Sequence, residues 1–185
     1  MLCSVDSVDS KKVNEFSNYR GHVRDLVCTQ SGSKNLQAYI NSLSDVVCEA
    51  IVEEIVSEVV PTGCEIICDT FGNYFYQVRM RGIGYPQLLF KKASASQKEL
   101  LLRSMLFPKG SSGSTIYEIS VNKTGTFAFQ NIIDFMSNNR VLGELIVKAL
   151  SSSVVNDNVE NVTLRLIREI KGTHIIQRIM KTFDV

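Results

Sequence analysis

The chain has 185 residues, 44% of them hydrophobic, and its 20 basic and 19 acidic side chains leave a formal net charge of +1. This length suits one ordinary domain with a buried core, and no segment has the apolar run of a membrane span or the layout of a secretory signal. The near-neutral charge argues against a duplex DNA partner more than against RNA, since most duplex binders are more basic. We also expect a cytoplasmic protein without a membrane partner.

The apolar residues lie at helical spacing and predict an all-α chain after a polar start. Residues 1–18 are rich in Ser, Asp and Asn, and we expect them to form a flexible tail. A short helix is predicted over 23–28, a second helix from Gly32 and a third over about 45–56, and no strand is expected.

The second unit of the chain begins at the predicted turn Pro61–Gly63. Residues 87–95 form a first insert, in which the apolar segment Leu88–Phe90 is expected to pack. Ser96 is predicted to cap a leucine-rich helix over 97–107.

A polar linker over 108–114 precedes the third unit. Helices are expected near 115–121, 125–136 and 142–150, then a second polar insert over 151–161, and then helices at about 162–169 and 172–182. The chain is thus predicted to contain repeats over 19–58, 59–108, 113–155 and 156–185, the last without a third helix.

A polar pattern recurs in each of these units. A glycine is followed five residues later by a glutamine in the segments Gly32–Gln37, Gly72–Gln77, Gly125–Gln130 and Gly172–Gln177. The residue after the glycine is small and polar (Ser33, Asn73, Thr126, Thr173), and the next is flat or long (Lys34, Tyr74, Phe127, His174). Six residues before the glycine lies Leu26, Ile66, Ile119 or Leu166. One polar signature per unit is typical of a solenoid whose units each present the same kind of contact.

Helical geometry gives this pattern a polar front and an apolar back. The small polar residue and the glutamine lie one turn apart and point the same way, with the flat or long residue beside them. The opposite side is predicted to face a core. It comprises Asn35, Leu36, Tyr39, Ile40, Phe75, Tyr76, Arg79, Met80, Ala128, Phe129, Ile132, Ile133, Ile175, Ile176, Ile179 and Met180.

A hydroxyl or amide paired with a glutamine amide can form two directional hydrogen bonds with the edge of a planar heterocycle. A flat neighbouring side chain can stack on that ring. A single exposed glutamine is usually just solvated, and a single Phe127 at helical spacing is more often part of a core. The aligned copies favour the alternative, which is a device that reads unpaired bases.

The segment Asp69–Gln77 reads D-T-F-G-N-Y-F-Y-Q and resembles the D-x-F-G-N-Y-x-x-Q signature of the PUF (Pumilio) RNA-binding family. The resemblance covers residues 19–185. It implies a curved, right-handed α-solenoid of three-helix repeats with the base-reading helices on the concave face. The pairs Ser33 with Gln37, Asn73 with Gln77, Thr126 with Gln130 and Thr173 with Gln177 would read base edges, and Lys34, Tyr74, Phe127 and His174 would stack.

The resemblance also implies bases and partners. Asn73 with Gln77 goes with uracil, and Ser33 with Gln37 goes with adenine, whereas the bases preferred at Thr126 and Thr173 stay open. An antiparallel RNA would read 5′-NAUA-3′, with N at the fourth repeat. The implied role is control of messenger RNA translation or decay through 3′ untranslated regions, with recruitment of a repressor or deadenylase.

Nothing in the sequence supports catalysis or a cofactor. The segment Gly110–Ser114 lacks the lysine of a phosphate loop, and His22 and His174 have no fixed partner. Cys64 and Cys68 could face one another as metal ligands, but reduced thiols packed as small hydrophobes are favoured for all five cysteines. The carboxylates Glu49, Glu53, Glu54 and Glu58 are expected to form a solvated helix face.

Two alternative functions stay open. One is an all-helical protein-interaction scaffold of the HEAT or armadillo kind, which has no reason to repeat the polar triad. The other is a divergent PUF-like ribosome-assembly factor. Because the last repeat is predicted to lack a third helix, we expect either a longer natural domain or self-association through the open carboxy-terminal end.

Overall fold

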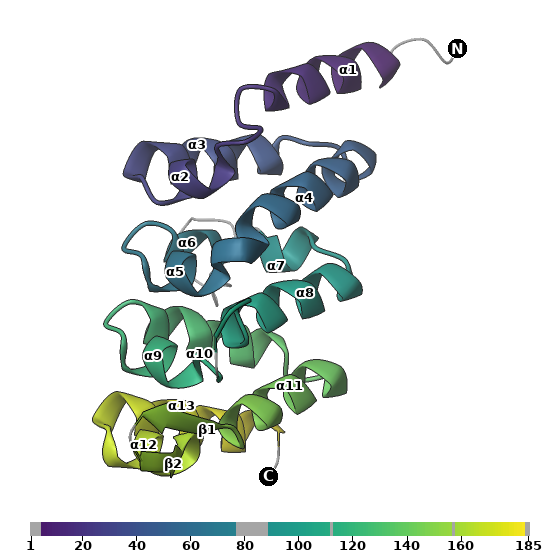
Figure 1. The fold of residues 1–185 in the computed structure, drawn as a ribbon. Helices are drawn as coiled ribbons and strands as arrows, with labels where there is room; N and C mark the ends of the chain where they lie inside the picture. The colour runs from purple at the N-terminus through teal and green to yellow at the C-terminus, as the bar shows by residue number, and fades with distance from the viewer. Residues whose placement is uncertain (1–4, 77–88, 112, 157, 184–185) are drawn as a thin grey trace.

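The computed structural model describes residues 5–76, 89–111, 113–156 and 158–183. In this part of the chain the helices stack in columns, with each unit lying on the previous one (Figure 1). The first helices of the units are α2 (Val23–Val27), α5 (Gly63–Cys68), α9 (Ile116–Val121) and α12 (Val162–Arg168). The second helices are α3 (Gln30–Asn41), α6 (Asn73–Tyr76), α10 (Gly125–Phe135) and α13 (Ile170–Phe183). The third helices are α4 (Asp45–Val59), α8 (Ala95–Leu106) and α11 (Arg140–Leu150).

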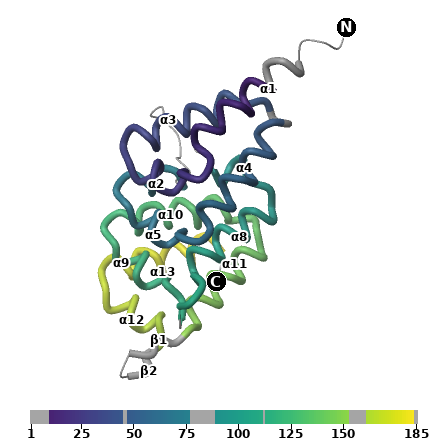
Figure 2. Tube along the Cα trace, turned by 45° about the horizontal axis from the view of Figure 1, so that its top comes forward, coloured from purple at the N-terminus to yellow at the C-terminus, as the bar shows by residue number. Residues whose placement is uncertain are grey.

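The expected all-α solenoid is therefore confirmed, with a short hairpin as an addition. Strands β1 (Ser153–Asn156) and β2 (Asn158–Asn161) pair antiparallel, with Ser153 opposite Asn161, in the insert predicted to be free of strands. Strand β2 ends directly before α12. Figure 2 shows α12 at the opposite end of the stack from helix α1 (Val5–Phe16).

The amino-terminal segment differs from the prediction. Residues 5–16 form helix α1 (Val5–Phe16), so the flexible tail expected over 1–18 is wrong here. Phe16 is fully buried, and its ring lies 6.1 Å from that of Tyr39, centroid to centroid. The Tyr39 hydroxyl donates to the Lys12 carbonyl oxygen at 2.7 Å, and burial raises the pKa of Tyr39 to about 12. The buried Phe16 side chain and one half-buried hydrogen bond thus hold a polar helix against the first repeat.

Two carboxylates of α4 fasten the segment that follows α1. Glu54 accepts from Arg20 through two hydrogen bonds of 2.6 and 2.8 Å. Glu58 accepts from the backbone N–H groups of Gly21 and Val23 at 2.7 and 3.0 Å. The solvated face of α4 expected from the sequence is present, with Glu49 and Glu53 exposed, and its partly exposed Glu54 and Glu58 also hold the chain entering α2.

The recurring glycine is required by close packing between the first and second helices. In each repeat, a Cβ added to the glycine would lie within 3.0 Å of the carbonyl oxygen of the residue six positions earlier. The distances are 2.3 Å for Gly32 and Leu26, 2.7 Å for Gly72 and Ile66, 3.0 Å for Gly125 and Ile119, and 2.4 Å for Gly172 and Leu166. The backbone of the first helix therefore approaches the glycine of the second helix at the same place in every repeat. A side chain there would force the two helices apart.

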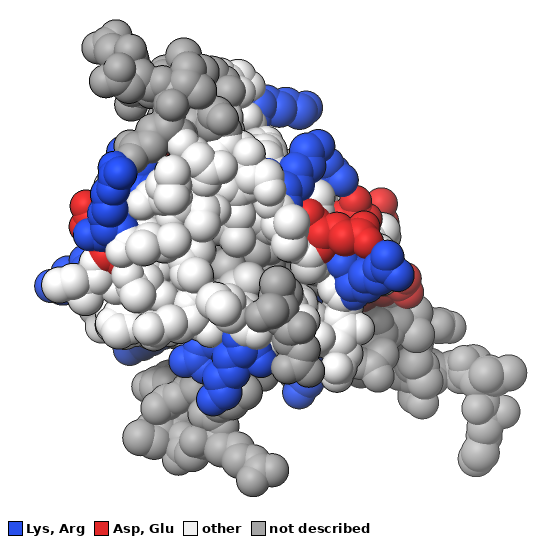
Figure 3. All heavy atoms as spheres, turned by 90° about the horizontal axis from the view of Figure 1, so that it is seen from below, with Lys and Arg blue, Asp and Glu red and all other residues white. Residues whose placement is uncertain are grey.

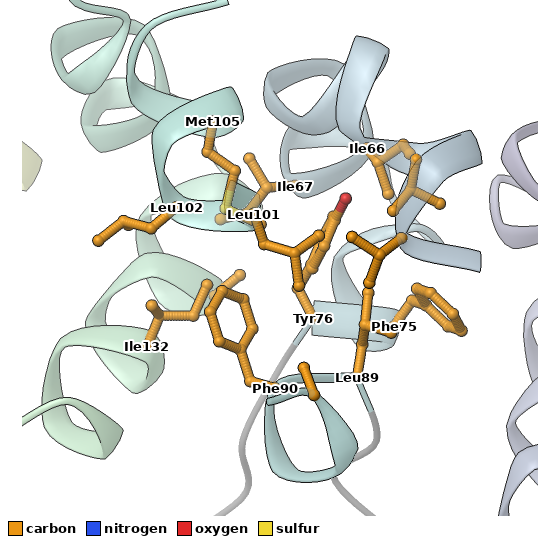
Figure 4. Close-up of a cluster of buried hydrophobic side chains, with 14 of the residues drawn as sticks. Ile66, Ile67, Phe75, Tyr76, Leu89, Phe90, Leu101, Leu102, Met105 and Ile132 are labelled. Atoms are coloured by element: carbon orange, nitrogen blue, oxygen red, sulfur yellow. The ribbon is translucent and has the colours of Figure 1, made fainter. Parts of the chain in front are cut away.

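The core between the second and third repeats is drawn in Figure 4. Its fully buried side chains include Ile66, Ile67, Phe75, Tyr76, Leu89, Phe90, Leu101, Leu102, Met105 and Ile132. Leu89 and Phe90 lie on the short helix α7 (Leu89–Lys92), which confirms for these two residues that the insert packs. The Tyr76 hydroxyl has no hydrogen-bond partner among the described residues, and burial raises its pKa.

Two helix starts also differ from the positions predicted from the sequence. Ser94, not the predicted Ser96, caps α8: its hydroxyl accepts from the Gln97 N–H while the Gln97 side chain accepts from the Ser94 N–H. This reciprocal capping box satisfies two backbone donors and fixes the helix start two residues earlier. The predicted turn Pro61–Gly63 is a 3-10 helix, η1 (Val60–Thr62), leading into α5. The limits of the repeats themselves stay a prediction.

The carboxy-terminal end of the stack exposes apolar side chains. On α11, α12 and α13, the exposed large hydrophobic residues are Val141, Val147, Leu164, Ile167, Ile170 and Met180. Figure 3, which views the molecule from below, shows a broad uncharged surface with basic and acidic side chains at its edges. None of the helices in the described part of the chain is both long enough and apolar enough to cross a membrane.

Candidate nucleic-acid interface

The small polar residue occupies the same backbone position in all four repeats. The N–H groups of Ser33, Asn73, Thr126 and Thr173 donate to the carbonyl four residues earlier at 3.0, 3.2, 3.2 and 2.8 Å. The same backbone hydrogen bond thus positions the small polar residue in each repeat.

The residue three positions before the glycine fixes the helix start in three repeats. The Thr29 hydroxyl accepts from Gly32 N–H at 3.1 Å, Asp69 Oδ1 from Gly72 N–H at 2.7 Å, and Asn122 Oδ1 from Gly125 N–H at 2.8 Å. The sequence analysis did not assign this role. The signal was available, since Thr, Asp and Asn are preferred capping residues and stand three residues before the glycine in these three repeats.

The predicted base-edge pair of the first repeat is brought together. Gln37 Nε2 donates to Ser33 Oγ at 3.0 Å, and the two residues are only 9% and 3% exposed. Ser33 Oγ lies 3.4 Å from the Phe71 carbonyl oxygen of the next repeat, to which it donates.

In the third repeat the corresponding hydrogen bond between the glutamine and the hydroxyl is longer. Gln130 Nε2 donates to Thr126 Oγ1 at 3.4 Å, and Thr126 is 3% exposed. Gln130 is partly exposed, unlike the buried Gln37 of the first repeat.

The second repeat is described only in part. Asn73 is 1% exposed, and its Nδ2 donates to the carbonyl oxygens of Asp69 and Thr70 at 2.8 and 2.7 Å. Gln77, its predicted partner, lies outside the described residues, as do Arg79 and Met80 of the predicted apolar back.

The fourth repeat is arranged differently. The Thr173 hydroxyl lies 3.0 Å from the Glu169 carbonyl oxygen and 3.2 Å from that of Ile167, and it donates to the backbone rather than engaging the glutamine. Gln177 is exposed. Thr173 and Gln177 both lie on α13, but in the described structure no hydrogen bond joins their side chains.

The predicted stacking residues all face solvent. Tyr74 and Phe127 are 57% and 64% exposed, and Lys34 and His174 are exposed as well. The described back positions of the same helices are buried or half-buried, except for Asn35 and Met180, which are exposed against the prediction. Asn35 is polar and lies at the edge of the apolar stripe, and Met180 lies on the last helix of the stack. An exposed aromatic ring on a helix whose opposite side is core provides a flat platform for a base.

Polar contacts link α13 of the fourth repeat to both α10 and α9 of the third repeat. Arg178 on α13 pairs with Asp134 on α10 at 3.2 Å, and Asp134 is only 17% exposed. Lys171 Nζ donates to the Val121 carbonyl oxygen at 3.1 Å. These contacts join residues distant in sequence, and no local pattern in the sequence indicated them.

Cys64 and Cys68 are hydrogen-bonded to each other on α5. This bond lowers the pKa of the Cys64 thiol and raises that of Cys68. In the described part of the chain, no three or more histidine, cysteine or acidic side chains come together in a group that could hold a metal ion.

Comparisons with known proteins agree with this geometry. The chain is 29% identical over 160 residues to the suppressor protein MPT5 of Saccharomyces cerevisiae, covering 86% of this chain and 16% of the relative. It is 27% identical to the Pumilio domain-containing protein C6G9.14 of Schizosaccharomyces pombe, covering 98% of this chain and 22% of that protein. The chain therefore spans less than a quarter of the length of these two relatives. No protein-family model matches it.

Solved structures are similar across most of the fold. The Puf4 RNA-binding domain bound to the HO endonuclease RNA 3′ UTR recognition sequence superposes with a TM-score of 0.63 at 22% identity, covering 89% of this chain and 41% of the other. The RNA-binding domain of yeast Puf5p bound to AAT2 RNA gives a TM-score of 0.63 at 24% identity, covering 88% and 38%. The resemblance to Pumilio proteins is thus confirmed, and the fold is that of the PUF RNA-binding domains.

Proposed function

We propose that this chain binds single-stranded RNA with sequence selectivity, one base to each repeat. The observation that carries the proposal is the hydroxyl–glutamine pair beside an exposed flat side chain, formed by Thr126, Gln130 and Phe127 in the third repeat. Such a site offers directional hydrogen bonds to a base edge and a platform for its face. The similar Puf4 and Puf5p domains are described as bound to RNA, which supports the same ligand class here.

The proposed RNA runs antiparallel to the protein and contains 5′-NAUA-3′. Adenine lies at Ser33 and Gln37, uracil at Asn73 and Gln77, and the next adenine at Thr126 and Gln130. N lies at the fourth repeat. The stacking partners are Lys34, Tyr74, Phe127 and His174, all exposed in the unbound protein.

The proposed role is binding without catalysis in the cytoplasm, at 3′ untranslated regions of messenger RNA. Regulation of translation or decay would follow from recruiting a repressor or deadenylase. The 3′ UTR sequence bound by the similar Puf4 domain supports this class of target.

A binding titration tests the proposal. Fluorescence anisotropy with a labelled RNA containing 5′-AUA-3′ is expected to give tighter binding than the same RNA with the uracil changed to guanine, by about 1–3 kcal/mol. Equal affinity for the two RNAs would contradict base reading. No binding to any single-stranded RNA would favour the alternative of a protein-interaction scaffold.

A further inference from the structure

The first helix of the second repeat carries two thiols one turn apart. We propose that Cys64 and Cys68 form a redox-sensitive pair, which a peroxide converts to a disulfide that opens the last turn of α5 and loosens the start of α6. The reaction needs only this chain and the oxidant, so the inference goes beyond the proposed RNA binding and does not depend on it.

The two thiols are neighbours, because residues four apart on a helix lie on one face. Both residues are half-buried rather than sealed in the core, so a small oxidant such as hydrogen peroxide can reach them. The pair belongs to the second repeat alone. At the same distances before the glycine, the other repeats carry Arg24 with Cys28, Tyr117 with Val121, and Leu164 with Arg168.

One hydrogen bond gives the two thiols different roles. The Cys68 thiol donates to the Cys64 sulfur, which lowers the pKa of Cys64 and raises that of Cys68. Burial and the carboxylates of Glu118 and Glu65 oppose the effect on Cys64 without cancelling it. The thiolate is the nucleophile in thiol oxidation. Cys64 is therefore the residue that peroxide oxidises, and Cys68 is the thiol that completes the disulfide.

The reaction balances with peroxide as the only oxidant. The Cys64 thiolate attacks one oxygen of hydrogen peroxide, the O–O bond breaks, and a sulfenic acid forms at Cys64 with release of hydroxide. The Cys68 sulfur then attacks the oxidised sulfur, the S–O bond breaks as the S–S bond forms, and the Cys68 proton leaves with the oxygen as water. The hydroxide takes up the proton that Cys64 lost earlier, which makes the second water.

The disulfide does not fit the helix as it stands. Cβ atoms one turn apart on a helix are about 5–6 Å from each other, whereas a disulfide needs about 3.5–4.5 Å. Helix α5 has six residues, of which Cys68 is the last, and the backbone becomes extended at Asp69, with φ −77° and ψ 148°. Closing the S–S bond therefore unwinds the last turn of α5, where the helix already ends.

The residue that follows Cys68 holds the start of α6. Asp69 Oδ1 accepts from the N–H groups of Phe71 and Gly72 at 2.8 and 2.7 Å. The Asp69 carbonyl oxygen accepts from the backbone N–H of Asn73 at 3.2 Å and from its Nδ2 at 2.8 Å. A backbone shift at Cys68 moves Asp69 with it, so these hydrogen bonds weaken together.

Cys68 also contacts the third repeat. A Cβ added to Gly125 would lie 3.0 Å from Cys68 Sγ, so the sulfur occupies the space beside this glycine at the start of α10. Drawing the sulfur toward Cys64 weakens that contact. The oxidation state of α5 is thus coupled to the second helices of two repeats, α6 and α10.

Thiol counting tests whether the pair forms. The reduced full chain is treated with hydrogen peroxide, unfolded in guanidinium chloride with iodoacetamide, and weighed by mass spectrometry. Two of the five cysteines are expected to escape alkylation until dithiothreitol is added. Cys64→Ser and Cys68→Ser should each abolish this product, whereas Cys28→Ser, which removes another half-buried thiol, should keep it.

Dimedone, which labels sulfenic acids, separates the two roles. In Cys68→Ser, peroxide is expected to leave a dimedone adduct on Cys64, because no second thiol remains to displace the oxygen. In Cys64→Ser, no adduct is expected on Cys68. Equal labelling of the two variants would overturn the assignment of Cys64 as the reacting thiolate.

Hydrogen exchange tests the structural consequence. The backbone N–H groups of Phe71, Gly72 and Asn73 are expected to exchange at least about fivefold faster in the oxidised chain, which corresponds to the loss of about one hydrogen bond. Helix α3 is the internal control and should exchange at an unchanged rate. A disulfide between Cys64 and Cys68 without faster exchange at the start of α6 would overturn the coupling.

The remaining outcomes decide the pair itself. Alkylation of all five cysteines after peroxide, or loss of the product in Cys28→Ser, would overturn the proposal. Should a serine variant not fold, as judged by circular dichroism, the unaltered chain still decides the question. Cleavage after Glu65, which lies between the two cysteines, is expected to give two peptides joined by the disulfide in the oxidised chain.

Discussion

At the scale of single residues, similar polar side chains have different roles because their partners differ. Ser33 and Thr126 accept from a glutamine, whereas Thr173 donates to the backbone and Asn73 binds two carbonyls with its amide. The chemistry presented to a ligand is set by which hydrogen-bonding capacity remains after these internal contacts.

Edge reading and stacking should separate when neighbouring residues are changed. Asn73→Ser is expected to shift preference at one base from uracil toward adenine, because the edge-reading residue changes while Tyr74 still stacks. Tyr74→Ala is expected to weaken binding to all RNAs by about 1–3 kcal/mol, since stacking tolerates any base. Titrations against RNAs differing at that base measure both effects. The same loss of affinity from both changes, without a change in preference, would show that the assigned roles are wrong.

Two buried tyrosines should respond oppositely to removal of the hydroxyl. Tyr76→Phe is expected to raise the free energy of unfolding by about 1 kcal/mol, because the hydroxyl is buried with no partner among the described residues. Tyr39→Phe is expected to lower it by about 1 kcal/mol, because its hydrogen bond to the Lys12 carbonyl oxygen is lost. Urea denaturation of both variants measures the difference. Destabilisation by Tyr76→Phe would mean that the hydroxyl does have a partner.

At the scale of elements, each repeat depends on a first and a second helix that touch through backbone atoms. The contact joins the recurring glycine to the carbonyl six residues earlier, and a capping side chain at the third position before the glycine fixes the turn in three repeats. In the second repeat, buried apolar side chains of α5, α6 and α8 meet in the core drawn in Figure 4.

A methyl group at the glycine contact should destabilise the repeat. In Gly32→Ala, the new Cβ would lie 2.3 Å from the Leu26 carbonyl oxygen, so the two helices must separate. We expect a loss of about 1–3 kcal/mol of stability, as for overpacked sites. Asn35→Ala, an exposed position on the same helix, is the control and should be nearly neutral. Thermal unfolding followed by circular dichroism compares them, and equal midpoints would contradict the packing role of Gly32.

At the scale of the whole molecule, the two ends of the stack differ. Helix α1 covers the amino-terminal end through Phe16 and the Lys12–Tyr39 hydrogen bond. At the other end, Ile167 and Ile170 are 54% and 81% exposed, and Figure 3 shows mostly uncharged surface. Exposed apolar side chains of this kind favour association in water.

This surface predicts association that depends on protein concentration. Light scattering at increasing concentration is expected to show a rising mean mass, and the double change Ile167→Glu with Ile170→Glu should suppress it, because burying the new charges is costly. Leu100→Glu, at an exposed apolar position on α8, is the matched control. A constant monomer mass for the unaltered chain would contradict self-association through this end.

The sequence by itself determined the helical repeats, the apolar back of the second helices and the exposure of the stacking residues, because these depend on spacing along a single helix. It did not determine that α1 folds onto the first repeat, that Glu54 and Glu58 hold the chain entering α2, or that residues 153–161 pair as strands, since each requires a partner elsewhere in the chain. The difference between Thr126 and Thr173 is of the same kind. Both follow a glycine and precede a glutamine at identical spacing, and only the three-dimensional positions of the Gln130 amide and of the Glu169 and Ile167 carbonyls decide which group each hydroxyl engages.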